Sequence, residues 1–256
     1  MTTTSTNRPT AVVTGGARGI GYSLAAAFAA AGMNVALLDL LDTVSDPAEK
    51  LAAAHSVAAV GISVDVTSQQ AVAAAFDRIT TELGVPQVLL TAAGICIWND
   101  SVDVPADQWR KVIAVNLDGT FYAAQAFAKG LIDGELSGSA IFISSMSASI
   151  VNVPQHQASY NASKAAVTHL GRSLAVEWAG AGIRVNSISP GYVLSDMTRQ
   201  LTDREPELRQ NWVSRIPQGR MAEPQDLEGL ALFLASDSSS YLTGQEIIID
   251  GGYCAV

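Results

Sequence analysis

Seven short runs rich in Val, Ile and Leu alternate with longer Ala-rich segments along the 256-residue chain, and most of these runs are apolar on both faces. A strand that is buried on both faces needs helices above and below it, whereas a half-solvated antiparallel strand would alternate apolar with polar residues. The pattern therefore predicts a doubly wound α/β sandwich around a parallel sheet. The predicted strands are Ala11–Thr14, Asn34–Asp39, Ala58–Val64, Gln87–Thr91, Ala140–Ser145, Arg184–Ser189 and Glu246–Asp250.

No linker, repeat or change in composition interrupts this alternation, so we expect one domain over residues 1–256, with a flexible polar tail over residues 1–9. α/β folds of roughly 200 to 250 residues often stay undivided. Only 15% of the residues are charged, well below the roughly 25% typical of soluble proteins. A surface with so few charged residues would be partly buried between the subunits of an oligomer.

Charge and apolar patterning exclude several classes of function. The net charge is −9 and Lys and Arg are not clustered, which argues against a nucleic-acid-binding protein. The most apolar stretch, Leu24–Leu38, is interrupted by Gly32 and Asn34 and is shorter than the roughly 20 residues that span a bilayer. The chain begins without a secretory signal, and Cys96 and Cys254 have neither disulfide-framework nor zinc-ligand spacing. We expect a cytoplasmic protein without a metal or a membrane partner.

A glycine-rich turn, Thr14-Gly15-Gly16-Ala17-Arg18-Gly19-Ile20-Gly21, follows the first predicted strand. Ligands of doubly wound sheets bind at the carboxyl ends of the strands. Glycine allows close backbone approach, and the helix that follows presents free N–H groups and partial positive charge to a pyrophosphate. The turn therefore indicates a dinucleotide site, with a plain glycine-rich connector as the alternative from the motif alone.

Asp39 ends the second predicted strand 18 residues after Gly21, close to the roughly 20-residue interval at which an acidic side chain binds the adenosine ribose. Its charge would repel the 2′-phosphate of NADP and so favours NAD. Arg18 argues the other way, because a guanidinium could pair with that phosphate. We give Asp39 more weight and expect NAD as the cofactor, with NADP less favoured. Asp65, after the third strand, is either a helix cap or an acceptor for the adenine amino group.

Tyr160 and Lys164 are four residues apart in the helical segment after the fifth strand, so they lie on one helix face. Hydride transfer to a carbonyl leaves an alkoxide that needs a proton, and a tyrosine with a pKa near 10 is a poor base for the reverse reaction at neutral pH. An ammonium about 4 Å away would lower that pKa by roughly two to three units before desolvation opposes it. Alone, this spacing is common on exposed helices, and it becomes specific only beside the glycine turn.

From Thr10 to Gly252 the chain resembles the short-chain dehydrogenase/reductase superfamily. The resemblance is carried by the glycine turn and by Asp39, Asp65, Asn116, Ser144–Ser147, Tyr160, Lys164, Pro190-Gly191 and Asp250-Gly251-Gly252. It implies a Rossmann-type fold with a seven-stranded parallel sheet. It also implies a homotetramer in which the two long helices after the fourth and fifth strands meet, although their apolar faces near Ala123–Phe127 and Leu170–Trp178 could equally be core.

The resemblance implies a catalytic tetrad of Asn116, a strand-end serine, Tyr160 and Lys164. Tyr160 would be the general acid/base, Lys164 would hold the nicotinamide ribose and lower the tyrosine pKa, and the serine would bind the substrate oxygen. Asn116 would fix a water in the proton path. Without the family context, Asn116 is better explained as an amide inside a helix that bonds a neighbouring carbonyl.

The expected cofactor contacts lie in the glycine turn and just after the strands. They are Gly15, Arg18, Gly19, Ile20, Gly21, Asp39, Asp65, Val66, Ala93, Gly94, Tyr160, Lys164, Pro190, Val193 and Ser195. Residues 194–219 are polar and contain no predicted strand. In this family the equivalent segment closes over the substrate, and such a lid would exclude water from hydride transfer.

Two features depart from the family pattern. The family usually has Asn-Asn-Ala-Gly after the fourth strand, and this chain has Thr91-Ala92-Ala93-Gly94, where we expect Thr91 to compensate in part for the lost amides. The catalytic serine commonly precedes the tyrosine by 13 residues, which selects Ser147, but Ser145 is the first serine beyond the strand proper. We choose Ser145, because a strand end places a side chain rigidly, and expect Ser147 to face the substrate's neighbouring hydroxyl.

The chain resembles the branch of polyol dehydrogenases, ketose reductases and secondary-alcohol carbonyl reductases. This resemblance is carried by Ser145-Met146-Ser147, Val151-Asn152-Val153-Pro154-Gln155 and Ser189-Pro190-Gly191-Tyr192-Val193. We therefore expect an NAD(H)-dependent oxidoreductase that acts on CH–OH donors and interconverts a secondary alcohol and its ketone. The substrate contacts would be Ser145, Ser147, Asn152 and Tyr160, although Ser and Asn are also ordinary turn residues.

Two other functions fit the sequence less well. An NADPH-dependent 3-oxoacyl thioester or general carbonyl reductase is disfavoured by Asp39. A non-catalytic dinucleotide sensor is disfavoured by the intact Ser145, Tyr160 and Lys164, since a sensor needs no tuned phenol.

Overall fold

The computed structural model describes residues 8–256, and for residues 196, 197, 200 and 201 the backbone only. Of the tail expected over residues 1–9, the first seven residues lie outside the described part. Seven parallel strands form one sheet in the order β3-β2-β1-β4-β5-β6-β7. This confirms the predicted sheet, with every strand end within two residues of its expected place. The strands are β1 Thr10–Thr14, β2 Asn34–Asp39, β3 Ala59–Ser63, β4 Val88–Thr91, β5 Gly138–Ile143, β6 Ile183–Pro190 and β7 Glu246–Ile249.

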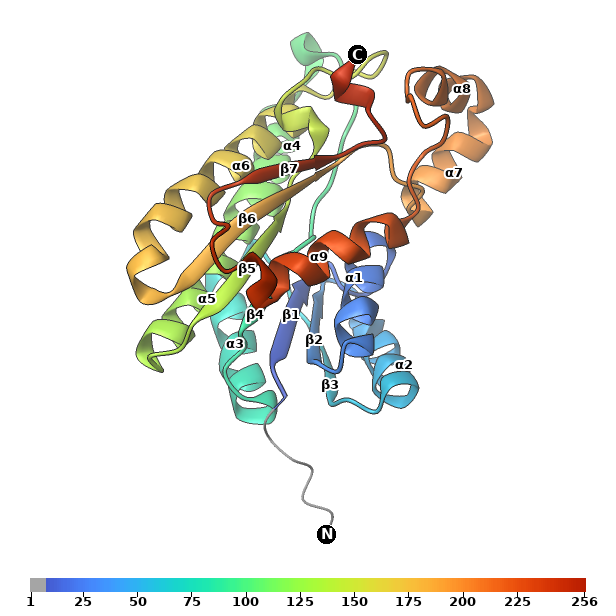
Figure 1. Ribbon diagram of the computed structural model, residues 1–256. Helices are drawn as coiled ribbons and strands as arrows, with labels where there is room; N and C mark the ends of the chain where they lie inside the picture. The colour runs from blue at the N-terminus through green and yellow to red at the C-terminus, as the bar shows by residue number, and fades with distance from the viewer. Residues whose placement is uncertain (1–7) are drawn as a thin grey trace.

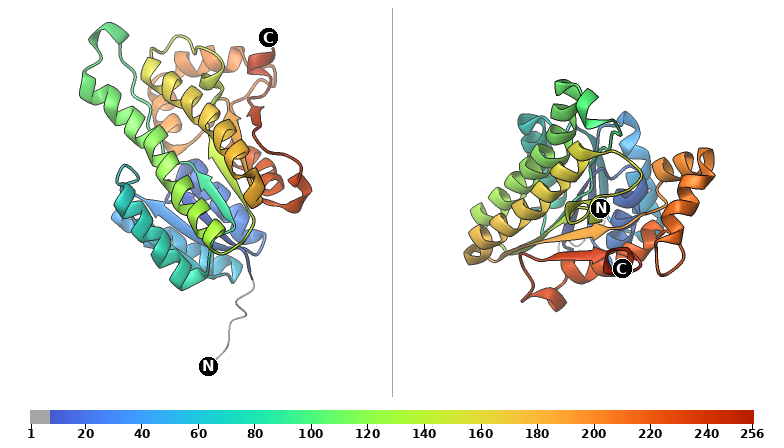
Figure 2. Two further views of the ribbon diagram at one scale, coloured as in Figure 1. Left: turned by 90° about the vertical axis from the view of Figure 1, so that its left-hand side faces the viewer. Right: turned by 90° about the horizontal axis from the view of Figure 1, so that it is seen from above.

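Helices cover both faces of the sheet (Figures 1 and 2). α1, α2 and α9 pack on one face around Leu24, Phe28 and Leu37. α3, α5 and α6 pack on the other around Phe127 and Phe142. This two-sided burial explains the continuous apolar strands. Within residues 8–256 the helices are α1 Gly19–Ala30, α2 Ser45–His55, α3 Gln69–Leu83, α4 Ala106–Ile113, α5 Gly119–Asp133, α6 Ala158–Trp178, α7 Asp196–Arg204, α8 Pro206–Ser214 and α9 Glu228–Ala235.

The direction of strand addition reverses between β1 and β4, which pair along Val12 and Leu89. At such a reversal the loops after the two strands diverge and leave a crevice at the carboxyl edge of the sheet. The glycine turn follows β1 and the loop beginning at Ala92 follows β4, so both predicted cofactor segments border this crevice.

The segment 194–219, in which we expected a lid, contains α7 and α8 and no strand. Figure 1 shows these two helices beside each other at one end of the molecule, with the C-terminus at the same end. The segment starts where Val193 forms a bridge with Ala222, and the Leu194 N–H donates to the Ala222 carbonyl at 2.7 Å. A small apolar cluster around Leu208 and Trp212 lies inside it.

None of the described helices combines the length and the apolar character needed to cross a membrane. Across residues 8–256, no group of three or more His, Cys, Asp and Glu side chains is arranged to hold a metal ion.

Candidate active site

The glycine turn is closed by backbone contacts that leave no room for side chains. Gly15 and Gly19 have φ values of +67° and +59°, which glycine adopts at little cost. A Cβ on Gly21 would lie 2.1 Å from the Gly15 carbonyl oxygen, and a Cβ on Gly15 would lie 2.7 Å from the Ala93 nitrogen. The turn is therefore packed against the loop after β4.

The N-terminus of α1 is suited to an anion. Arg18 occupies the position before the helix with an extended backbone, and no side chain in the described part of the chain caps the helix there. Uncapped N–H groups at the positive end of a helix are a binding site for phosphate. Ser195, at the start of the 194–219 segment, lies beside the turn, since a Cβ on Gly19 would be 3.7 Å from the Ser195 Cβ.

The Asp39 carboxylate is fixed beside the glycine turn. One oxygen accepts from the Ala17 N–H at 3.0 Å and the other from the Leu41 N–H at 3.1 Å. This places the acidic side chain next to Arg18, so the two residues with opposite preferences for the coenzyme are neighbours. The glycine turn and the Asp39 carboxylate therefore lie side by side, as a site for the pyrophosphate and the adenosine ribose of one dinucleotide requires.

Asp65 lies in the exposed turn after β3. Its Oδ1 accepts from the Thr67 N–H at 2.9 Å and from the Thr67 hydroxyl at 2.8 Å. The cap of α3 is Ser68, whose hydroxyl accepts from the Ala71 N–H, so the helix-cap explanation of Asp65 is wrong. Val66 lies against the start of α5, because a Cβ on Gly119 would come within 2.8 Å of its side chain.

Thr91 does not replace the missing amides of the β4 loop. Its hydroxyl is buried and has no hydrogen-bond partner within residues 8–256. The Ala93 N–H donates instead to the Thr14 hydroxyl, at 3.3 Å. The loop is thus tied to β1 through Thr14 rather than through Thr91.

Asn116 braces the same loop. It is fully buried in a π-helical turn, Ala114–Asp118, between α4 and α5, and such turns are frequent at functional sites. Its side chain accepts from the Ile95 N–H at 2.8 Å and donates to the Ile95 carbonyl at 3.0 Å and to the Ser163 hydroxyl at 2.9 Å. The amide therefore bonds a distant loop rather than a carbonyl of its own helix.

Tyr160 and Lys164 extend from α6 toward the crevice. The Lys164 ammonium donates to the Ile143 carbonyl at the end of β5, at 2.7 Å, and lies 5.7 Å from the centre of the Tyr160 ring. A Cβ on Gly94 would be 3.4 Å from Asn116 Oδ1 and 3.6 Å from Lys164 Nζ. Asn116, Tyr160 and Lys164 thus meet around Gly94, where the cofactor and catalytic residues were expected to adjoin.

Burial dominates the acid–base properties of this pair. It raises the pKa of Tyr160 to about 12, with a smaller increase from Cys96, while a hydrogen bond with Ser145 opposes both. Burial also lowers the pKa of Lys164 to about 8. The expected net fall of the tyrosine pKa is therefore not found. Desolvation of the buried phenolate outweighs the groups that stabilise it.

Ser145 is the serine that contacts Tyr160. It lies two residues after the end of β5 and lowers the pKa of the Tyr160 phenol, whereas Ser147 lies behind it. The Ser145 hydroxyl donates to Ser147 Oγ at 3.1 Å, and the Ser147 hydroxyl donates to Asn152 Oδ1 at 2.5 Å. Ser147 also accepts from Gln157 Nε2 at 3.3 Å, so its hydrogen-bonding capacity is already used within the protein.

Sequence reasoning missed several side chains around this centre. The Cys96 thiol donates to Gln157 Oε1 at 3.5 Å, and burial raises its pKa to about 11, so it stays protonated beside Tyr160. Trp98, Tyr192 and Trp212 form an aromatic wall. The only signal for Cys96 and Trp98 was their position just after β4. Trp212 gave none beyond being a large aromatic in a polar segment.

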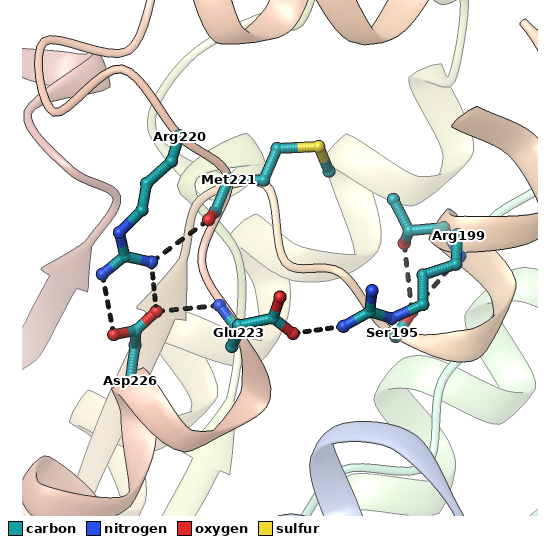
Figure 3. Close-up of polar contacts among 7 residues, drawn as sticks. Ser195, Arg199, Arg220, Met221, Glu223 and Asp226 are labelled. Atoms are coloured by element: carbon teal, nitrogen blue, oxygen red, sulfur yellow. Dashed lines mark hydrogen bonds and ion pairs between the residues drawn. The ribbon is translucent and has the colours of Figure 1, made fainter. Parts of the chain in front are cut away.

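Ion pairs fix the segment 194–219 at its α7 side (Figure 3). Arg199 of α7 pairs with Glu223, and Arg220 pairs with both oxygens of Asp226 at 2.6 and 2.9 Å. The Arg220 guanidinium holds the pKa of Asp226 below its usual value. Asp226 also accepts from the Glu223 N–H at 2.8 Å, so the two pairs form one surface network. Exposed pairs of this kind contribute about 0–1 kcal/mol each.

A family model described as enoyl-(acyl carrier protein) reductase matches residues 15–254. The chain is 45% identical over 249 residues to a sorbose reductase of Schizosaccharomyces pombe, covering 96% of each chain. It is 42% identical to a galactitol 2-dehydrogenase (L-tagatose-forming) of Cereibacter sphaeroides, covering 95% of this chain and 94% of the relative. A solved structure of a short-chain type dehydrogenase/reductase from Mycobacterium marinum superposes with a TM-score of 0.91 at 39% identity, covering 97% and 96%.

The relatives differ in the coenzyme that their names state. An NADH-dependent L-xylulose reductase of Ambrosiozyma monospora is 38% identical, covering 94% of this chain and 93% of the relative. The solved structure of an NADPH-dependent 3-quinuclidinone reductase from Rhodotorula rubra has a TM-score of 0.90 at 35% identity, covering 100% and 97%. Similarity to these proteins therefore does not select between NAD and NADP.

Proposed function

Because the chain belongs to the short-chain dehydrogenase/reductase family and interconverts a secondary alcohol and its ketone, we propose that its substrate is a polyol or the corresponding ketose and that its coenzyme is NAD(H). One observation carries the proposal: the Tyr160 phenol has Ser145 and Lys164 beside it. The names of two relatives, a sorbose reductase and a galactitol 2-dehydrogenase, support a substrate with several hydroxyls.

In the reduction, the substrate carbonyl oxygen would lie against the hydroxyls of Tyr160 and Ser145. Tyr160, with its raised pKa, is a phenol at neutral pH and can give its proton to the oxygen as negative charge develops there. The Ser145 hydroxyl, which donates to Ser147 in the structure, would turn to donate to that oxygen and orient it. The ammonium of Lys164 stabilises the phenolate that remains, and a bound nicotinamide dinucleotide supplies the hydride. In the oxidation, the phenolate of Tyr160 removes the proton from the alcohol.

The substrate is tested by assaying NAD and NADP with sorbitol, mannitol, galactitol, xylitol and short vicinal diols. We expect turnover of at least one polyol, with NAD the better oxidant. Clear turnover of 3-oxoacyl thioesters with NADPH, and of none of these alcohols, would overturn the substrate assignment.

The pH dependence should differ between the two directions. The phenolate fraction of Tyr160, whose pKa is about 12, grows about tenfold per pH unit below that value. We therefore expect kcat/KM for alcohol oxidation to rise from pH 7 to pH 10. Ketone reduction uses the phenol, which stays protonated over this range, so its kcat/KM should not rise. It should fall above pH 8 as far as loss of the Lys164 charge removes stabilisation of the phenolate. Initial rates in both directions check this.

The charge of Lys164 gives a second test of the pH dependence of alcohol oxidation. Because its pKa is lowered to about 8, its charge is present at pH 7 and largely lost by pH 10. The Lys164→Met variant should therefore lose more oxidation activity at pH 7 than at pH 10. A constant ratio between the two enzymes across this range would contradict a role for the ammonium charge.

Coenzyme choice is predicted to depend on Asp39. The Asp39→Asn variant keeps one acceptor oxygen, which can bond the Ala17 or the Leu41 N–H but not both as the carboxylate does. It removes the charge that would face a 2′-phosphate. Like-charge juxtaposition costs several kcal/mol, so we expect the ratio of kcat/KM for NADP to that for NAD to rise by about tenfold or more. Adding Arg18→Ala should reverse much of this gain. An unchanged ratio in Asp39→Asn would show that the carboxylate does not face the ribose.

We also propose a homotetramer in the cytoplasm. Ala123, Phe127 and Trp178, which could have faced another subunit, are buried in the core. Support for an interface comes instead from exposed apolar side chains of the same helical layer: Trp109 on α4 is 42% exposed and Val176 on α6 is 82% exposed. The unpaired thiols of Cys96 and Cys254 suit a reducing compartment. Sedimentation velocity measures the number of subunits.

A further inference from the structure

Trp212 packs α8 against the loops beside the candidate active site. It is only 2% exposed and stacks on Tyr192, with ring centres 4.3 Å apart and planes 13° apart. Its ring also meets Trp98 edge-on, with centres 6.2 Å apart. Its indole N–H donates to Gln155 Oε1 at 3.3 Å. One side chain of the 194–219 segment thus contacts the loops that follow β4, β5 and β6.

The indole fixes the orientation of the Gln155 amide. An indole nitrogen only donates, so Gln155 must turn its oxygen toward Trp212 and its NH₂ group away. That NH₂ group donates to the Tyr192 hydroxyl at 3.1 Å. The reversed amide would set two donors against each other at Trp212, and a buried unsatisfied donor is costly.

The same network of hydrogen bonds extends from Tyr192 to Ser145. The Tyr192 oxygen also accepts from Asn152 Nδ2 at 3.4 Å, which directs Asn152 Oδ1 toward Ser147. Ser147 then donates to Asn152 and accepts from Ser145. Five side chains between Trp212 and Tyr160 are therefore linked by hydrogen bonds of defined direction: Gln155, Tyr192, Asn152, Ser147 and Ser145.

We propose that Trp212 and Gln155 are positioning residues, which orient Ser145 through Tyr192, Asn152 and Ser147 when α8 is seated. Neither side chain needs to touch the reacting atoms. Their effect is to hold Ser147 against the Ser145 side chain and so to fix the position of Ser145 Oγ, and this inference rests on the proposed role of Ser145 in holding the substrate oxygen. Linked hydrogen bonds of this kind can be apportioned only by combining substitutions.

A double-mutant cycle tests the linkage. Trp212→Phe keeps the stacked ring and removes the N–H, and Tyr192→Phe keeps its ring and removes the hydroxyl. Each should lower kcat/KM for the alcohol about fivefold, the factor that corresponds to one ordinary hydrogen bond. The double variant should lose little more than either alone, because both substitutions break the same chain. Trp178→Phe, a buried tryptophan of α6 outside this network, should keep full activity.

Two substitutions of Gln155 distinguish an effect of hydrogen-bond direction from an effect of packing. Gln155→Glu can still accept from the indole but cannot donate to Tyr192, whereas Gln155→Leu can do neither. We expect both variants to lose about the same factor in kcat/KM as Trp212→Phe. Full activity of Gln155→Glu, or multiplicative losses in the double-mutant cycle, would overturn the proposal.

Indole ¹⁵N–¹H spectra give a readout that needs no turnover. The Trp212 signal is identified by its loss in Trp212→Phe. It should shift and exchange faster in Gln155→Leu and stay close to its original position in Gln155→Glu, while the Trp178 signal is unchanged in both. An unmoved Trp212 signal in Gln155→Leu would refute the linkage. Absence of turnover by the unmodified protein with every alcohol would instead refute the proposed function.

Discussion

Replacing Tyr160 by Phe is expected to lower kcat by about two to four orders of magnitude, the usual contribution of a positioned general acid/base. The change removes a single hydroxyl and leaves Lys164 bonded to the Ile143 carbonyl. The glycine turn and Asp39 are far along the chain from this helix and keep their backbone contacts. NADH affinity, followed by fluorescence titration, should therefore change less than the rate does.

Tyr241→Phe is the matched control, because that side chain is fully exposed and its hydroxyl should be dispensable. Turnover of Tyr160→Phe close to that of Tyr241→Phe would disprove the acid–base assignment. A parallel loss of NADH binding would indicate that the hydroxyl acts in holding the coenzyme.

Gly21→Ala should damage coenzyme binding more than its single methyl group suggests. The new Cβ would stand 2.1 Å from the Gly15 carbonyl oxygen, and a backbone atom cannot move aside as a flexible side chain can. Overpacking of this kind typically costs about 1–3 kcal/mol, which lowers the Tm of a protein of this size by about 2–4 °C per kcal/mol. We also expect NADH affinity to fall by at least about tenfold, because the displaced turn carries the phosphate-binding N–H groups.

Gly229→Ala in α9 is the matched control. A Cβ at Gly229 meets nothing within 4 Å in the described structure, and alanine favours a helix by about 1 kcal/mol over glycine. That variant should melt at the same or a higher temperature and bind NADH normally. Normal binding by Gly21→Ala would mean that the turn can widen without cost.

The fold could be predicted from the sequence where burial or local backbone geometry restricts which residues a position accepts. Strands such as β1 are buried along their whole length, so their continuous apolar pattern identified them within two residues. The glycine turn was also readable, because positive φ and close backbone approach leave few residues other than glycine. Tyr160 and Lys164 could be paired because helix periodicity is local.

Features that depend on tertiary contact could not be read in this way. The pKa of Tyr160 depends on how deeply α6 is enclosed by other elements, which no spacing encodes. Thr91 was expected to form a bond, but the Ala93 N–H reaches Thr14 instead. Trp212 is about 57 residues from Gln155 in sequence, and its role depends on how α8 folds back over the loops after β4 and β6.

The loop after β4 contacts both the expected coenzyme site and the expected site of proton transfer. Ala93 presses against Gly15 at the pyrophosphate end, and two residues later Ile95 is clamped by Asn116 next to Lys164. A shift of this short stretch would therefore move the coenzyme cradle and the proton-transfer group together. We therefore expect substitutions in this stretch to change coenzyme affinity and catalytic rate together.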